Sequence, residues 1–264
     1  MQIGIIGLQT SGKTTVFNAL THGHAETSLG GGEKDPNRGI AKVPDERVDF
    51  LAELYKPKKI TYATVEFTDV AGLTKGAGQE KGFSNRFLGH LRDMEALLIV
   101  ARVFKSESVP HPEGAVDPAR DLDLILTELI LADLVIVENR FKRIDESYNK
   151  QPAMRKELEI EKKSLHRFHE ALENNRPIIS TVPTPDEINK YIRPYGLLSG
   201  KQMLGLANLS DLTDPQETAW LQELEEAGTR WNLPIVPMNA QLERDLQDFP
   251  LEEWDDYFSA SGLE

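Results

Sequence analysis

Two glycines, a lysine and a threonine near the start of the chain have the types and spacing needed to bind phosphate. Residues 7–14 read Gly-Leu-Gln-Thr-Ser-Gly-Lys-Thr, which matches the phosphate-loop pattern G-x-x-x-x-G-K-S/T at every fixed position. In such a loop, successive backbone N–H groups at a helix N-terminus surround the phosphate oxygens. An apolar segment, residues 2–6, precedes the loop, and a helical pattern follows it. The sequence therefore predicts a nucleotide-binding site.

Each fixed residue of this loop has a distinct expected role. Gly7 and Gly12 permit the turn and the close approach of backbone to phosphate. The Lys13 ammonium supplies positive charge for the β- and γ-phosphates, and the Thr14 hydroxyl is a ligand for Mg²⁺. The loop residues expected to contact the nucleotide are Gly7, Thr10, Ser11, Gly12, Lys13, Thr14 and Thr15.

A carboxylate at the end of a later predicted strand supplies the second half of the chemistry. Asp69 is followed three residues later by Gly72, which forms the pattern D-x-x-G. Asp69 can hold Mg²⁺ through water, and the Gly72 N–H can sense the γ-phosphate. The ordinary alternative is a strand-end aspartate that caps a turn. Together with the phosphate loop, however, this pattern favours a switch-type NTPase over a small-molecule kinase.

Residues 208–211, Asn-Leu-Ser-Asp, follow a predicted strand where a base-reading N-K-x-D would lie. The Asp211 carboxylate can accept hydrogen bonds from guanine N1–H and the 2-amino group, whereas Leu209 replaces the expected lysine. These features point in opposite directions, so the choice between ATP and GTP stays open. Asn239 and Ala240 could add a backbone contact to the base. An ordinary strand-end turn is the alternative for Asn208 and its neighbours.

His111 is the titratable loop residue best placed for catalysis, because it lies in an irregular connection between Pro110 and Pro112. A histidine in such a setting is either a group that takes part in hydrolysis or a structural residue. Both interpretations remain open at this point.

The elements that must position these residues alternate along the chain. Strands are predicted over residues 2–6, 39–43, 60–69, 96–103, 202–208 and 235–238, and helical patterns separate them. This alternation predicts an α/β fold of the P-loop NTPase, G-domain-like type, in which helices flank a mostly parallel sheet. We expect the nucleotide-binding domain to comprise residues 1–121 and 198–264, with an inserted helical arm over residues 122–197.

The predicted arm is an antiparallel helical hairpin. Two runs of seam residues, each spaced 4-3-4-3-4, flank a break at residues 150–152, and this period of about 3.5 residues is typical of packed helix pairs. The seams are Ile130, Leu134, Val137, Phe141, Ile144 and Tyr148, then Met154, Leu158, Glu161, Leu165, Phe168 and Leu172. Glu161 departs from the apolar pattern. The arm could be a spacer or a partner-binding surface.

The composition narrows the class of protein. The chain has 264 residues, a formal net charge of −13 and no cysteine. The negative charge disfavours nonspecific binding to DNA or to an anionic membrane. The longest apolar run, residues 96–100, is far shorter than the roughly 20 residues of a membrane helix. These features predict a cytoplasmic protein without disulfides.

The chain resembles the YchF-type Obg-like ATPases, a branch of the translation-factor-related P-loop NTPases. The residues that carry the resemblance are 4–20, 43–47, 55–61, 64–73, 75–77, Asn85, 87–88, Arg92, 116–118 and 127–133. The resemblance is strong over the first half of the chain and weak over its final third. In the predicted arm it covers little beyond the start of the first helix. The resemblance implies a purine nucleotide with Mg²⁺, ATP often being preferred, and an association with the ribosome and translation. The family continues into a C-terminal TGS domain, which we expect to be missing here, because the sequence is either a truncated chain or a divergent short member.

The resemblance also assigns roles and shows departures. Leu73 stands where related GTPases place a water-orienting glutamine, so slow hydrolysis is expected, and His111 matches the histidine proposed to assist it. Thr10 replaces an asparagine linked to potassium stimulation, which puts that stimulation in doubt. Glu33 replaces a threonine of the first switch. Asp211 replaces the family's glutamate, which puts ATP preference in doubt.

The predicted function is purine nucleotide binding and slow Mg²⁺-dependent hydrolysis as a molecular switch linked to the ribosome. The residues expected to act in hydrolysis are Lys13, Asp69, Gly72 and His111, and those expected to hold Mg²⁺ are Thr14 and Asp69. The alternative is a non-hydrolysing nucleotide-sensing adaptor whose helical arm binds a partner.

Overall fold

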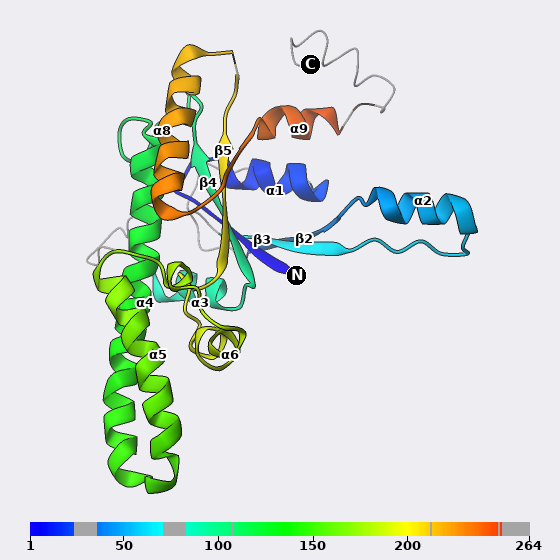
Figure 1. Cartoon of the computed structure of the whole chain (residues 1–264). Coiled ribbons are helices and arrows are strands. Elements are labelled where there is room, and N and C mark those ends of the chain that lie inside the picture. The colour runs from blue at the N-terminus through cyan, green and yellow to red at the C-terminus, as the bar shows by residue number, and fades with distance from the viewer. Residues whose placement is uncertain (24–35, 71–82, 107, 212, 248, 250–264) are drawn as a thin grey trace.

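The structure is a computed structural model that describes residues 1–23, 36–70, 83–106, 108–211, 213–247 and 249. Within them one six-stranded sheet has the order β2-β3-β1-β4-β5-β6 (Figure 1). All neighbouring strands are parallel except β2, which runs antiparallel to β3. The strands are β1 Gln2–Ile6, β2 Asn37–Lys42, β3 Thr64–Asp69, β4 Ala96–Arg102, β5 Gln202–Asn208 and β6 Ile235–Met238. The predicted mostly parallel α/β fold is confirmed.

Helices cover both faces of this sheet. The α-helices are α1 Lys13–Thr21, α2 Glu46–Tyr55, α3 Asn85–Arg92, α4 Pro118–Lys150, α5 Arg155–Glu173, α6 Pro185–Glu187, α7 Arg193–Tyr195, α8 Pro215–Trp231 and α9 Ala240–Leu246. Short 3-10 turns span Pro152–Met154 and Ile178–Thr181, and a π-helical turn spans Ile188–Ile192. Helices α1 and α9 pack on one face, and α3, α4 and α8 on the other (Figure 1).

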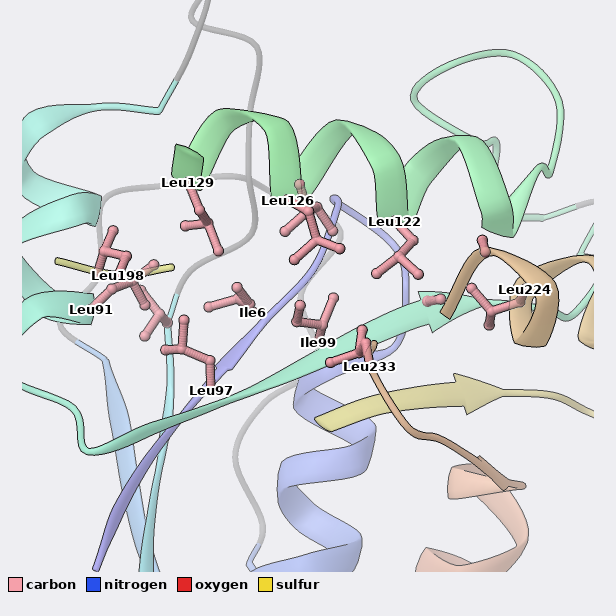
Figure 2. Packing of buried hydrophobic residues seen from close by; sticks show 14 of the residues in the cluster. Ile6, Leu91, Leu97, Ile99, Leu122, Leu126, Leu129, Leu198, Leu224 and Leu233 are labelled. Atoms are coloured by element: carbon pink, nitrogen blue, oxygen red, sulfur yellow. The ribbon is translucent and has the colours of Figure 1, made fainter. Parts of the chain in front are cut away.

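The main hydrophobic core lies between the sheet and the first third of α4. Figure 2 shows Leu122, Leu126 and Leu129 of α4 above the central strands β1 and β4. The other labelled members of this cluster are Ile6, Leu91, Leu97, Ile99, Leu198, Leu224 and Leu233. Because β1 and β4 are covered on both faces, the loops after them start from fixed points.

The helical arm is confirmed as an antiparallel pair formed by α4 and α5 (Figure 1). The buried residues of its core include most of the predicted seam: Ile130, Val137, Ile144, Leu158, Leu165, Phe168 and Leu172. Glu161 stays on the buried seam because the Arg140 guanidinium donates to it at 2.5 and 2.8 Å and the Tyr195 hydroxyl at 2.6 Å. Met154 is instead exposed at the turn.

The packing divides α4 later than the predicted domain boundary at residue 122. Residues Leu122 to Leu129 belong to the core of the body, and the arm core begins at Ile130. On the return path Leu197 packs in the arm core and Leu198 in the body core. The boundary at 122 therefore cuts a helix whose first third is part of the nucleotide-binding body.

Helix α2 leaves its apolar side chains exposed. The spacing of Val48, Leu51 and Leu54 places them on one face of the helix, yet no residue of α2 is buried. Leu51 is 50% exposed and Leu54 61%. Figure 1 shows the reason, since α2 lies at the far end of the extension that joins β2 to β3.

Candidate functional site

The phosphate loop is a strained turn between β1 and α1. Gly12 has φ 91° and ψ 17°, and Thr10 has φ 63°, so both residues are left-handed. A Cβ atom on Gly12 would lie 2.1 Å from Asn208 Nδ2, and one on Gly7 would lie 2.4 Å from the Val100 carbonyl oxygen. Side chains are therefore excluded at both positions, which keeps the backbone open to phosphate.

Lys13 is held over this loop. Its side chain starts at the first turn of α1, and Nζ donates to the Leu8 carbonyl oxygen at 2.7 Å. Burial lowers the pKa of the Lys13 ammonium to about 8, although the nearby Asp69 carboxylate raises it. A bound phosphate would raise the pKa of Lys13 again and favour the charged form, because it replaces lost hydration with opposite charge.

The predicted magnesium ligands meet directly. Thr14 Oγ1 donates to Asp69 Oδ2 at 2.8 Å. Burial raises the pKa of Asp69, while the Thr14 hydroxyl, the Lys13 charge and the side chain of Asn37 on β2 lower it. A hydroxyl beside a carboxylate is a hard oxygen donor pair, which fits an Mg²⁺ ion that also keeps waters and phosphate oxygens. Thr14 and Asp69 would hold the ion there.

The described residues contain no group of three or more His, Cys, Asp or Glu side chains that could hold a metal ion unaided. A magnesium ion held by Thr14 and Asp69 would take its remaining ligands from water and the nucleotide phosphates.

The remaining loop residues present backbone rather than side chains. Ser11 is 2% exposed, its carbonyl oxygen accepts from Asn208, and its hydroxyl finds no hydrogen-bond partner among the described residues. Thr15 lies half-buried in the first turn of α1. Gly72, Leu73 and Glu33 lie outside the described residues.

Asn208 joins the base side of the site to the phosphate loop. Its Nδ2 donates to the Ser11 carbonyl oxygen at 3.0 Å, and its Oδ1 accepts from the Ala240 N–H at 3.3 Å. Asn239 caps α9 through the Leu242 N–H and donates to the Ser210 carbonyl oxygen at 2.7 Å. The Ala240 N–H, one of the backbone groups predicted to contact the base, is therefore used within the scaffold, and so is the Asn239 side chain.

Leu209 and Asp211 point in different directions. The Leu209 side chain is buried in the main core, so the structure does not bring it to the site. Asp211 Oδ1 accepts from the Thr213 N–H and hydroxyl, both at 2.7 Å, and these bonds lower the pKa of Asp211. One oxygen of this exposed carboxylate is thus used in a local turn.

Glu217 is a site residue that sequence reasoning missed. It is 2% exposed in the first turn of α8, and its carboxylate accepts from the N–H groups of Ser210 and Asp211 at 2.8 and 3.0 Å. It also accepts from the Ser210 hydroxyl at 2.7 Å and the Lys105 N–H at 3.3 Å. A glutamate just inside the Asp214-Pro215 helix start is the signal that could have identified it.

His111 is buried beside the phosphate loop. Its Nε2 lies 2.9 Å from Asp121 Oδ2, with side-chain exposures of 2% and 3%, and Nδ1 accepts from the Glu113 N–H at 3.1 Å. The neighbouring Pro110 carbonyl oxygen accepts from the Thr10 hydroxyl at 3.4 Å. Nε2 faces the Asp121 carboxylate as a donor, and Nδ1 holds the lone pair that accepts from the Glu113 N–H. A role for His111 as a base therefore requires it to leave both partners, and that role stays a prediction.

A glycine loop between strand and helix, a buried lysine at the helix start and a carboxylate at the end of the neighbouring parallel strand define a P-loop NTPase of the G-domain type. Residues 2–140 match the family described as 50S ribosome-binding GTPase. The chain belongs to the YchF family, since its relatives there match along nearly its whole length.

Three relatives illustrate the match. "Ribosome-binding ATPase YchF" of Bacillus subtilis is 34% identical over 99% of this chain and 71% of its own length. The protein of the same name from Escherichia coli O157:H7 has the same identity and coverage. The solved structure of the Schizosaccharomyces pombe YchF GTPase superposes with a TM-score of 0.79 at 29% identity, over 100% of this chain and 72% of that one.

Proposed function

We propose that this chain binds ATP or GTP together with Mg²⁺, hydrolyses it slowly, and acts as a molecular switch on the ribosome in the cytoplasm. The observation that carries the proposal is the pairing of Lys13 over the phosphate loop with the Thr14–Asp69 contact at 2.8 Å. The printed names of the bacterial relatives, which include ribosome binding and ATPase, support the partner and the reaction.

In this proposal the residues act mainly by position and charge. The Lys13 ammonium neutralises the β- and γ-phosphates, and the backbone of residues 10–14 binds their oxygens. When bound, Mg²⁺ supplies further charge neutralisation of the transferring phosphoryl group. Asp69 and Thr14 fix where that charge lies, because both side chains are constrained by their neighbours.

The expected slow turnover follows from the state of His111. A general base must reach the proton that it accepts, directly or through one water. His111 instead bonds to Asp121 and to the Glu113 N–H, and its side chain is 2% exposed. The group proposed to activate water must therefore first leave these partners, and this additional step lowers the rate.

Lys13→Ala tests the nucleotide site. We expect it to weaken binding of both ATP and GTP by about 100-fold or more, which corresponds to roughly 2.7 kcal/mol. Calorimetric titration of each nucleotide with Mg²⁺ measures the effect, and Lys201→Ala is a control for loss of a half-buried lysine outside the site. Unchanged binding by Lys13→Ala contradicts the proposal.

The second candidate function is a non-hydrolysing nucleotide-sensing adaptor whose arm binds a partner. The buried His111–Asp121 pair favours it, and so do the exposed side chains of Leu131, Val135 and Ile160 on the arm. Phosphate release measured over hours, with and without ribosomes, separates the two. Turnover above background that Asp69→Ala abolishes rejects the adaptor, whereas its complete absence rejects hydrolysis.

Ribosome association has its own test. Co-sedimentation of the chain with purified ribosomes should depend on the bound nucleotide, and the comparison is between a non-hydrolysable ATP analogue and ADP. Equal co-sedimentation in both nucleotide states would show that the chain does not work there as a nucleotide switch.

A further inference from the structure

Arg102 is a buried cation at the last residue of β4, next to the phosphate loop. It is 2% exposed, and burial lowers the pKa of its guanidinium, whereas the charge of Asp121 raises it. A buried charge is costly unless each donor finds a partner. The contacts of Arg102 therefore show what it holds together.

The three nitrogens of the guanidinium bond to three different residues. Nε donates to the Phe104 carbonyl oxygen at 3.2 Å, Nη2 to the Val109 carbonyl oxygen at 2.9 Å, and Nη1 to Thr10 Oγ1 at 3.3 Å. The guanidinium carbon also lies 4.5 Å from the centre of the Phe104 ring. Only an arginine has donors in a planar fork that spans acceptors in this way.

These contacts join two segments that are far apart in sequence. Thr10 belongs to the phosphate loop, and Phe104 and Val109 belong to the connection from β4 to α4. The Thr10 hydroxyl in turn donates to the carbonyl oxygen of Pro110, the residue before His111. Arg102 and Thr10 thus set the position of the chain immediately before His111.

Asp121 is a further fixed point of this connection, next to His111 itself. Its carboxylate bonds to His111 at 2.9 Å, and it is itself held by the Arg120 guanidinium at 2.7 and 3.1 Å. When His111 leaves Asp121, the contacts of Arg102 and Thr10 still hold the connection against the phosphate loop. The range of positions that His111 can reach then depends on Arg102.

We propose that Arg102 is a positioning residue for hydrolysis, which fastens the His111-bearing connection to the phosphate loop through Thr10. This inference rests on the proposed hydrolysis, and it adds a residue to which neither the phosphate-loop pattern nor D-x-x-G assigns a role. Arg102 makes none of the expected phosphate contacts, which come from Lys13, Thr14 and the loop backbone. Its loss should therefore lower turnover and leave nucleotide affinity nearly unchanged.

The test compares Arg102→Met and Thr10→Val with the native chain. Arg102→Met removes the charge and keeps the apolar stem, and Thr10→Val removes only the hydroxyl that links Arg102 to Pro110. Arg140→Met, which removes an arginine from the arm, is the matched control. The measurements are affinity for a non-hydrolysable ATP analogue, single-turnover hydrolysis of ATP, and NMR signals of the His111 ring nitrogens.

We expect Arg102→Met to lower the hydrolysis rate by about tenfold or more, with affinity within about threefold of the native value. The NMR signals of the His111 ring should broaden or shift, because the connection that carries the ring is no longer fastened to the phosphate loop, although Asp121 can still accept from Nε2. Thr10→Val should lower the rate to a smaller extent, and Arg140→Met should change neither the rate nor the His111 signals.

A native rate in Arg102→Met, or a faster one, overturns the proposal, and so does an equal loss of affinity and rate. If melting curves show that Arg102→Met does not fold, the hydrolysis rate of Thr10→Val tests the proposal instead, since this variant leaves the buried guanidinium in place. A native rate in Thr10→Val would then overturn the proposal. Absence of turnover in the native chain is a different result, because it removes the proposed hydrolysis itself.

Discussion

The phosphate loop and residues 208–211 follow two strands of the same sheet, yet they use their polar groups differently. The phosphate loop directs Lys13, Thr14 and backbone N–H groups at one place, and glycines keep that place open. On the base side, Asn208, Asp211 and Asn239 use their polar atoms on neighbouring parts of the protein. From this difference we expect that contacts to the phosphates contribute most of the nucleotide affinity. Contacts to the base should discriminate little between ATP and GTP.

Gly12→Ala should have the largest effect on this comparison. Its new Cβ would lie 2.1 Å from Asn208 Nδ2 at φ 91°, so the loop must distort. We expect nucleotide affinity to fall by about 100-fold or more in calorimetric titrations. Gly114→Ala is the matched control, because Gly114 has φ 87° but nothing within 4 Å of the Cβ position. If both variants lost the same nucleotide affinity, backbone strain alone would explain the effect, and the contact with Asn208 would not.

Asn208→Ala should weaken both halves of the site together. It leaves the Ser11 carbonyl oxygen and the Ala240 N–H without their partner, which should destabilise the fold by about 2–4 kcal/mol. We expect ATP and GTP affinities to fall by similar factors of roughly tenfold to thirtyfold. Thermal melting and paired titrations measure both effects, and Asn239→Ala is the milder control. A loss confined to one nucleotide would show that Asn208 reads the base.

Nucleotide affinity should fall as pH rises above about 8. In the free protein the Lys13 ammonium, with its pKa near 8, is largely deprotonated at pH 9, whereas bound phosphate favours the charged form. Binding at that pH therefore takes up a proton, and affinity decreases by up to about tenfold per pH unit. Calorimetric titration with nucleotide in buffers of different ionisation enthalpy measures how many protons are taken up on binding.

Lys13→Arg is the control for this pH dependence, because a guanidinium does not titrate in this range. If native affinity is flat between pH 8 and about 9.5 while Lys13→Arg behaves identically, Lys13 is not the titrating group.

The smallest effect should come from Asp211→Ala. One oxygen of this carboxylate is held by Thr213, so its removal should change the ratio of ATP to GTP affinity by less than about tenfold. In the native chain we expect the two nucleotides to differ by less than about 100-fold. Titration of the native chain and of Asp211→Ala with ATP and with GTP measures these ratios. A larger difference between the two nucleotides would contradict the view that phosphate contacts contribute most of the affinity.

Site residues could be predicted from the sequence where they lie together in one short motif. Lys13 and Thr14 belong to a motif whose spacing implies its strand, turn and helix, and the D-x-x-G start at Asp69 implies a neighbouring strand. The roles of Arg102 and Glu217 could not be predicted, because each depends on segments about 90 or more residues away or on loops whose path the sequence does not specify.

Burial was harder to predict than helix or strand. The spacing in α2 predicts an apolar face, but whether another element covers that face depends on the direction of the β2–β3 extension. Glu161 shows the opposite case, since a charge on an apolar seam becomes acceptable once Arg140 and Tyr195 converge on it from other helices.

One consequence follows from the continuity of α4. Asp121, which bonds to His111, lies in its first turn, and the same unbroken helix ends at Lys150 at the tip of the arm. With a rise of 1.5 Å per residue, about 44 Å separate these ends. A tilt of about 5° at the root would thus displace the tip by about 4 Å, the thickness of a side-chain layer. A change of tilt at the root, where Asp121 bonds to His111, would thus be transmitted along α4 to the tip of the arm.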